Sequence, residues 1–131
     1  IMKAFDMIDT SAVCDFDDVP ATHWAYEAVA SACQNEIIFG VDAREFGAGQ
    51  AITRQDMAVI VYRAAKKAGY QFENSGDLSF SDTTEIADYA RESVSAMSAA
   101  GIIKGHPDFR FAPLENTTRA QAAQVIYAVV K

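Results

Sequence analysis

The sequence predicts a mainly α fold of tandem helix–loop–helix repeats with little or no sheet. The strongest sign is internal repetition, because a shift of 65 residues aligns the segment from Trp24 to Ala64 with a later segment without a gap. Apolar residues also recur at helical spacing in four segments. A fixed period is typical of repeat architectures, in which each unit covers an apolar face of its neighbour. The aligned pairs include Trp24/Tyr89, Glu27/Glu92, Gly40/Gly105, Thr53/Thr118, Arg54/Arg119 and Tyr62/Tyr127.

The composition of the chain limits the classes of protein to which it can belong. It has 131 residues, a net charge of -7 and a hydrophobic content of 50%. Such a chain can bury a core, so it is not a disordered tail. The acidic surface disfavours nucleic acid and anionic membranes as partners, and no apolar run is long enough to span a membrane. The chain starts at Ile1 without a signal peptide, and we expect it to be part of a longer protein.

The repeat divides the chain into four parts of one module, 1–131. Residues 1–14 are predicted to be the tail of a preceding repeat, because residues 1–9 resemble the segment that closes the second helix of the first full copy. Residues 15–69 and 80–131 form the two full copies. Residues 70–79 are polar, contain a glycine and are predicted to be the linker between the copies.

The first helix of each copy is predicted over His23–Asn35 and Asp88–Ala100. Asp88 is a plausible N-cap, and Gly101 is a plausible stop signal. Short apolar pieces follow both helices and are expected to be extended buried segments or brief strands. The predicted inward residues are Trp24, Ala28, Val29, Ala32 and Cys33 in one copy and Tyr89, Val94 and Met97 in the other.

The second helix of each copy starts with a capping box, in which a threonine and a side chain three residues later bond each other's backbone N–H groups. The pairs are Thr53 with Asp56 and Thr118 with Gln121. Gly69 ends the first of these helices, and the other runs to the chain end. The predicted inner stripes are Met57, Ile60, Val61 and Ala64, and Ala122, Val125, Ile126 and Val129, with Tyr62 and Tyr127 expected in the core.

Arg54 and Arg119 follow the capping threonines and are the principal candidates for ligand binding. A cation at the first position of a helix is mildly unfavourable, because the helix dipole is positive there. The same place offers N–H groups without intrahelical partners, and a guanidinium beside them makes a good anion site. Two interpretations follow: the arginines bind an external anion, or they pair internally with acids such as Asp18, Asp82 or Glu115.

The aromatic residues and the cysteines each allow two interpretations. Trp24 and its counterpart Tyr89 are either core anchors or platforms for a sugar ring, because the C–H face of a pyranose packs on an aromatic face. Cys14 and Cys33 are either buried thiols or partners in a disulfide of an exported protein. No spacing typical of a metal site, a phosphate-binding loop or a catalytic triad is present, so we predict neither metal nor cofactor.

Each copy carries further motifs in the same order. The first copy contains Phe16-Asp17-Asp18-Val19, His23-Trp24-Ala25, Ile37-Ile38, Gly40, Phe46 and Ile52-Thr53-Arg54-Gln55-Asp56-Met57-Ala58. The second contains Phe80-Ser81-Asp82, Gly101-Ile102-Ile103-Lys104-Gly105, Pro107-Asp108-Phe109-Arg110-Phe111-Ala112-Pro113 and Thr118-Arg119-Ala120-Gln121. Over nearly the whole chain, this order and spacing resembles the S-layer homology (SLH) repeat.

The resemblance implies a fold and a ligand. SLH repeats usually come in threes, pack as a pseudo-threefold, mostly helical spindle, and anchor secreted proteins to the cell envelope without a covalent bond. In Gram-positive bacteria the ligand is typically a secondary cell-wall polysaccharide, often pyruvylated, and an Ile-Thr-Arg-Ala-Glu motif supplies the arginine that meets the pyruvyl carboxylate. The implied ligand-binding residues are Trp24, Gly40, Thr53, Arg54, Tyr89, Gly105, Thr118 and Arg119.

Two departures from the family pattern stand out. Gln55-Asp56 and Ala120-Gln121 replace the alanine and glutamate of the motif, and Tyr89 replaces its tryptophan. We still predict a non-catalytic extracellular module at the cell surface or cell wall (S-layer). Its predicted partner is an acidic secondary cell-wall polysaccharide or a peptidoglycan-linked polymer. The alternatives are a structural module that self-associates to complete a three-repeat spindle, and an enzyme fragment that acts on glycans.

Overall fold

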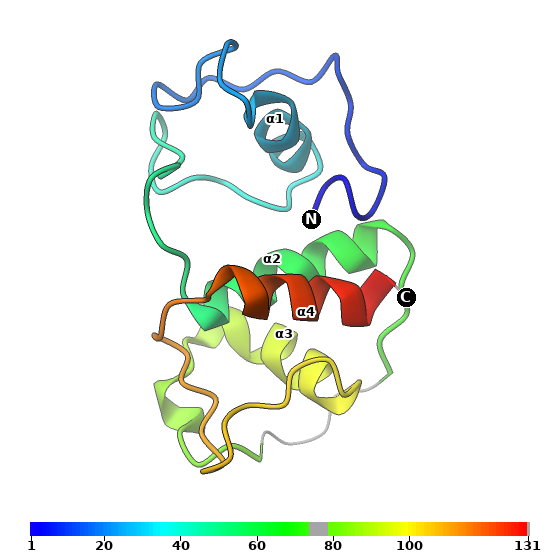
Figure 1. Cartoon of the computed structure of the whole chain (residues 1–131), viewed down its shortest axis with the longest axis vertical. Coiled ribbons are helices and arrows are strands. Elements are labelled where there is room, and N and C mark those ends of the chain that lie inside the picture. The colour runs from blue at the N-terminus through cyan, green and yellow to red at the C-terminus, as the bar shows by residue number, and fades with distance from the viewer. Residues whose placement is uncertain (74–78, 131) are drawn as a thin grey trace. The chain divides into compact units, whose positions relative to one another are not determined.

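The computed structural model describes residues 1–73 and 79–130, and these residues form four α-helices (Figure 1). No strand is present in these two ranges; one isolated bridge joins Thr53 and Asn116. The mainly α prediction is therefore confirmed. The helices are α1 (Tyr26–Gln34), α2 (Arg54–Lys67), α3 (Asp88–Ala99) and α4 (Arg119–Val130), with a short 3₁₀ helix, η1 (Thr83–Glu85), before α3.

The chain folds into two compact units, Ile1–Gln50 and Ala51–Lys131. These units are out of phase with the sequence repeat. The first unit contains α1, whereas α2, the second helix of the first copy, lies in the second unit and packs against α3 and α4 of the next copy. Each unit is described separately below.

In the first unit, α1 begins three residues later than predicted. Its N-cap is Ala25, which has no side-chain oxygen to offer, and the ring of His23 accepts the N–H of Ala25 at 3.1 Å. This bond holds residues 23–25 in a turn outside the helix. Trp24 is therefore 92% exposed, and its predicted place in the inward stripe is wrong. The buried face of α1 consists of Val29, Ala30, Ser31 and Ala32.

The start of the chain has the hydrogen bonds of a helix C-terminus. The N–H of Asp6 bonds the carbonyl of Lys3 and that of Met7 bonds the carbonyl of Met2, with a positive φ of 53° at Asp6. This combination is the Schellman motif. The same two bonds end α2, where Gly69 has a φ of 95°. Residues 1–9 form turns and no helix in the structure, and the tail of a preceding repeat predicted over residues 1–14 stays a prediction.

Two aspartates hold equivalent loops in the two copies. The Asp18 carboxylate accepts the N–H groups of three consecutive residues that begin at Phe46, at 2.8–2.9 Å. The Asp82 carboxylate accepts those of Phe111 and Ala112 at 2.9 and 2.8 Å. Both acids were candidate partners of the arginines, but they instead fold the loops that precede α2 and α4.

Gly40 and Gly105 occupy equivalent tight places in these loops. Their φ angles are 83° and 71°, a region that favours glycine. A Cβ atom would lie 2.7 Å from the Phe16 ring at Gly40 and 2.6 Å from the Phe80 ring at Gly105. The close approach of an aromatic ring to bare backbone explains why both copies have glycine here.

The core of the second unit centres on α2. The predicted inner residues Met57, Val61 and Ala64 are buried, as are Val94 and Met97 of α3. Tyr62 is 9% exposed, which confirms its place in the core. Of the apolar pieces that follow the first helices, Ile102 and Ile103 are buried in this unit. In the first unit Ile37 is buried, but Ile38 is half-buried and Phe39 is 64% exposed, so the buried segment expected there is only partly confirmed.

Three predictions about the helices of the second copy are wrong. Tyr127 is 64% exposed, because only Val129 of α4 is buried. Tyr89 is 58% exposed rather than inward. Asp88 is the first residue of α3 and not its N-cap; the N-cap is Ala87, whose N–H donates to the Gln55 side chain of α2 at 3.0 Å.

Candidate functional site

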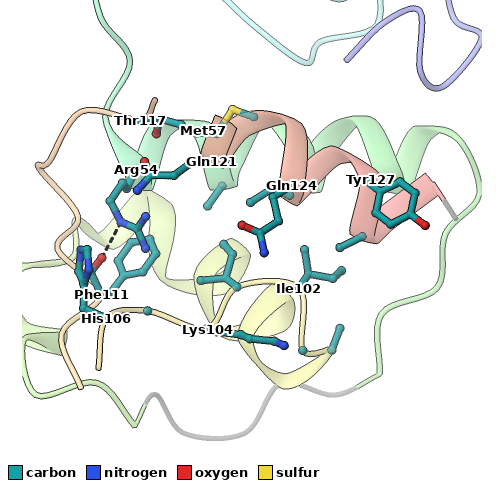
Figure 2. A pocket seen from close by; sticks show the side chains of 17 residues that line it. Arg54, Met57, Ile102, Lys104, His106, Phe111, Thr117, Gln121, Gln124 and Tyr127 are labelled. Atoms are coloured by element: carbon teal, nitrogen blue, oxygen red, sulfur yellow. Dashed lines mark hydrogen bonds between the residues drawn. The ribbon is translucent and has the colours of Figure 1, made fainter. Parts of the chain in front are cut away.

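A cavity of about 700 Å³ opens in the second unit between α2, α4 and the segment 100–106 (Figure 2). Two of the predicted site residues, Arg54 and Gly105, line it. None of its 17 lining residues is an aspartate or glutamate, although the chain as a whole carries a net charge of -7. The basic side chains on its wall are Arg54, Lys104 and His106.

Arg54, the first residue of α2, turns its side chain toward the loop before α4 (Figure 2). Its Nε donates to the Phe111 carbonyl at 2.8 Å, and the guanidinium carbon lies 5.2 Å from the centre of the Phe111 ring. Within residues 1–73 and 79–130 it forms no ion pair, and its two terminal nitrogens make no hydrogen bond. Burial lowers the pKa of Arg54, while Glu115 and Asp82 act in the opposite direction. The terminal nitrogens are thus available to an anion.

The backbone at the start of α2 does not offer the predicted N–H groups. The N–H of Arg54 donates to the Glu115 carbonyl at 2.8 Å, and that of Gln55 donates to the Pro113 carbonyl at 3.0 Å. The next N–H, of Asp56, donates to the Thr53 hydroxyl at 3.3 Å. The expectation of bare amides beside Arg54 is therefore wrong, and the guanidinium itself is the available donor.

At the start of α4 the capping box is complete. The Thr118 hydroxyl accepts the Gln121 N–H at 3.1 Å, and the Gln121 side chain accepts the Thr118 N–H at 3.0 Å. In α2 only the threonine half forms, because the Asp56 carboxylate accepts the Tyr89 hydroxyl instead. Arg119 is exposed and forms no ion pair in the described part of the chain.

Three further residues of the cavity were not predicted as site residues. Lys104 and His106 flank Gly105, and the His106 ring lies 3.0 Å from the Glu115 carboxylate. Thr117 has a buried hydroxyl with no hydrogen-bond partner among the described residues. A buried polar atom without a partner is uncommon, so this hydroxyl marks a place where a ligand or water can bind. The proximity of Lys104 and Thr117 to the motif residues Gly105 and Thr118 is the only signal in the sequence that pointed to them.

The remaining predicted residues lie outside this cavity. Trp24 and Gly40 belong to the first unit, where the Trp24 ring stacks near His23 at a centroid distance of 5.6 Å. Tyr89 lies on α3 and is not part of the cavity wall. Thr53 and Thr118 act as helix N-caps. Cys14 and Cys33 are half-buried thiols.

The sequence profile of the S-layer homology domain matches residues 15–58 and 79–123 of this chain. The chain belongs to the S-layer homology family. An amylopullulanase of Thermoanaerobacterium thermosulfurigenes is 35% identical to this SLH chain over all of it, and the match covers 7% of that protein. The surface-layer 125 kDa protein of Lysinibacillus sphaericus is 36% identical over 70% of the chain and 7% of its own length. A cellulosome-anchoring protein of Acetivibrio thermocellus is 28% identical over 85% of the chain and 25% of its own length.

The SLH chain thus spans a quarter or less of the length of these relatives. Family membership and these surface proteins place it at the cell surface or cell wall, in a role of cell-surface anchoring. In the described ranges, no helix is long and apolar enough to cross a membrane, and no three metal-binding side chains come together.

Proposed function

We propose that this SLH chain anchors its parent protein by binding an acidic cell-wall polysaccharide, without catalysis, and that the Arg54 cavity is one binding site. The observation that carries the proposal is the charge of this cavity. A chain with 18 acidic and 11 basic residues has a cavity wall with basic side chains and no acidic ones. Such a local concentration of positive charge favours an anionic ligand, and salt confines the repulsion from distant acids to about 10 Å at 0.1 M.

Arg54 is suited to bind a carboxylate such as a pyruvyl group. Its Nε bond to the Phe111 carbonyl and its position over the Phe111 ring fix the plane of the guanidinium. A fixed guanidinium loses little conformational entropy when its terminal nitrogens bind both oxygens of a carboxylate. The sugar ring would lie along the apolar side chains of Met57, Ile102 and Val125, and the Thr117 hydroxyl would gain the partner it lacks within the described residues.

The other residues implied by the SLH pattern remain proposed contacts at equivalent places. Arg119 and Thr118 repeat Arg54 and Thr53 at the start of α4, and Gly40 repeats Gly105. Trp24 and Tyr89 expose aromatic rings on which a sugar can stack.

Co-sedimentation of the purified protein with cell-wall sacculi tests this proposal. Arg54→Ala should weaken binding about 10- to 100-fold, because a hydrogen-bonded charge contributes about 1.5–3 kcal/mol. Arg54→Lys should restore only part of it, since an ammonium lacks the planar pair of donors. Arg119→Ala tests the second proposed position.

Arg110→Ala is the matched control. Arg110 is an exposed arginine next to Phe111 in the loop before α4, but it pairs with Asp108 at 2.7 Å and is not part of the cavity wall. Its loss should leave wall binding nearly unchanged. If folded Arg54→Ala and Arg119→Ala proteins bind sacculi as tightly as the unchanged protein, the proposed mechanism is wrong.

A second candidate function is self-association, and the surface of α4 favours it. In α2 the face that carries Tyr62 is covered by α3, whereas the corresponding residue of α4, Tyr127, is 64% exposed. A second copy of the chain would cover α4 by placing its α1 there, since Glu27 of α1 corresponds to Glu92 of α3. Light scattering over a hundredfold concentration range tests this: a constant monomer mass would exclude it.

A further inference from the structure

The residues that depart from the SLH pattern, Gln55, Asp56 and Tyr89, belong to one hydrogen-bonded network between α2 and α3. The Tyr89 hydroxyl donates to the Asp56 carboxylate at 2.5 Å, and the Gln55 amide donates to the same hydroxyl at 3.3 Å. The Gln55 carbonyl oxygen accepts the N–H of Ala87 at 3.0 Å. Gln55 is only 5% exposed, so its polar side chain depends on these partners. We call Gln55, Asp56, Tyr89 and the Ala87 N–H the inter-helix network.

A second bond joins the same two helices about two turns further along α2. The Tyr62 hydroxyl of α2 donates to the Glu92 carboxylate of α3 at 2.9 Å. Both residues occur in both copies, because Tyr62 corresponds to Tyr127 and Glu92 to Glu27. Any second helix and any first helix of this chain therefore carry the side chains for this bond.

The inter-helix network differs in this respect. In the other copy, Gln55 and Asp56 correspond to Ala120 and Gln121, and Tyr89 corresponds to Trp24. The Ala120 side chain has no amide group. The Trp24 side chain has an N–H donor but no hydroxyl that can both donate and accept. Gln121 already accepts the Thr118 N–H in the α4 capping box. The network therefore forms only when α2 lies against α3.

We propose that the inter-helix network makes α3 the specific partner of α2, while the Tyr62–Glu92 bond is common to both copies. Specificity of this kind arises when a buried polar group finds its partners in one pairing and loses them in every other. A first helix with tryptophan in place of Tyr89 would leave the buried Gln55 amide and the Asp56 carboxylate without this hydroxyl. The proposal concerns the pairing of repeats and does not depend on wall binding.

Exchange of the copy-specific residues tests the proposal. Gln55→Ala with Asp56→Gln gives α2 the residues of α4, and Tyr89→Trp gives α3 the residue of the first copy. The triple variant should self-associate at about tenfold lower concentration than the unchanged protein, because α2 no longer discriminates between α3 and the first helix of another molecule. Light scattering after size-exclusion chromatography measures this shift, and circular dichroism verifies the fold. If the triple variant does not fold, the same self-association measurement is made on Tyr89→Trp alone.

A double-mutant cycle on the Asp56–Tyr89 bond supplies an independent measurement. With Asp56→Asn and Tyr89→Phe, the effects on the unfolding equilibrium should deviate from additivity by about fivefold, because contacting residues couple. In the matched control, Tyr62→Phe with Glu92→Gln should lower stability without promoting self-association. Additive effects at Asp56 and Tyr89, or unchanged association of the exchanged variants, would overturn the proposal.

Discussion

α2 and α4 occupy the same place in the two copies, but their surroundings differ. Eight residues of α2 are buried, whereas α4 buries only Val129. Carbonyl groups of the loop 113–117 accept the first two N–H groups of α2. At the start of α4, the described part of the chain provides only the capping box that Thr118 and Gln121 form with each other.

This difference shows that the environment of a helix in a repeat protein is set by the next repeat as well as by its own sequence. Both helices have apolar residues at the same spacing. The copy that follows α2 supplies the helices that cover it and the loop that bonds its first N–H groups. The nearest-neighbour character of repeat proteins explains the result.

The largest expected effect comes from truncating equivalent apolar side chains. Val61 of α2 is fully buried, and its counterpart Ile126 of α4 is half-buried. Val61→Ala should destabilise the second unit by about 2 kcal/mol, through lost burial and a cavity that cannot collapse. Ile126→Ala removes more atoms but should cost only about 1 kcal/mol. Urea unfolding measures the loss of unfolding free energy in each variant. Equal losses would contradict the expected difference between α2 and α4.

An alkaline titration tests the buried tyrosine of α2. Burial, with the bond to Glu92, raises the pKa of Tyr62 to about 12. Unfolded tyrosine ionises near pH 10, so this stability is complete below about pH 10 and lost as pH rises through about 12. The rise in pKa from about 10 to about 12 corresponds to at most about 2.7 kcal/mol, and solvent screening at this part-buried hydroxyl should reduce the loss to about 1 kcal/mol. Urea midpoints across this range, with Tyr62→Phe as control, measure it. A Tyr62→Phe protein with an unchanged alkaline loss would refute the assignment.

The smallest effect is expected from the N-cap threonines. Thr53→Ala should cost about 1 kcal/mol, because it leaves the part-buried Asp56 N–H without an acceptor. Thr118→Ala should cost about 0.5 kcal/mol, because water can replace the cap at the exposed start of α4. Hydrogen exchange at the first turns separates local fraying of α4 from global unfolding. Larger destabilisation by Thr118→Ala would reverse the order.

The sequence predicted the features that depend on local chemistry. Helix caps at Thr53 and Thr118 and stops at Gly69 and Gly101 act within a few residues, and the structure has them in place. The position of Arg54 after a capping threonine made it a candidate from the sequence, whereas Gly105 was implied only by the SLH resemblance; both line the same cavity.

The features that the sequence missed depend on which segments lie side by side. Tyr62 and Tyr127 have the same spacing, but Tyr62 is 9% exposed, with α3 packed against its helix, whereas Tyr127 is 64% exposed. The carbonyls of Pro113 and Glu115 accept the N–H groups at the start of α2. No local sequence pattern predicts this contact between distant segments. Lys104 and Thr117 enter the cavity from loops that have no periodicity.

The boundary between the two units, at Gln50 and Ala51, precedes α2, whereas the sequence period places α2 at the end of the first copy. A gene duplication that copies one period therefore copies part of one compact unit together with part of the next. For recombinant work, a fragment cut at the sequence period separates α2 from the helices that bury it, whereas a fragment that starts at Ala51 keeps them together.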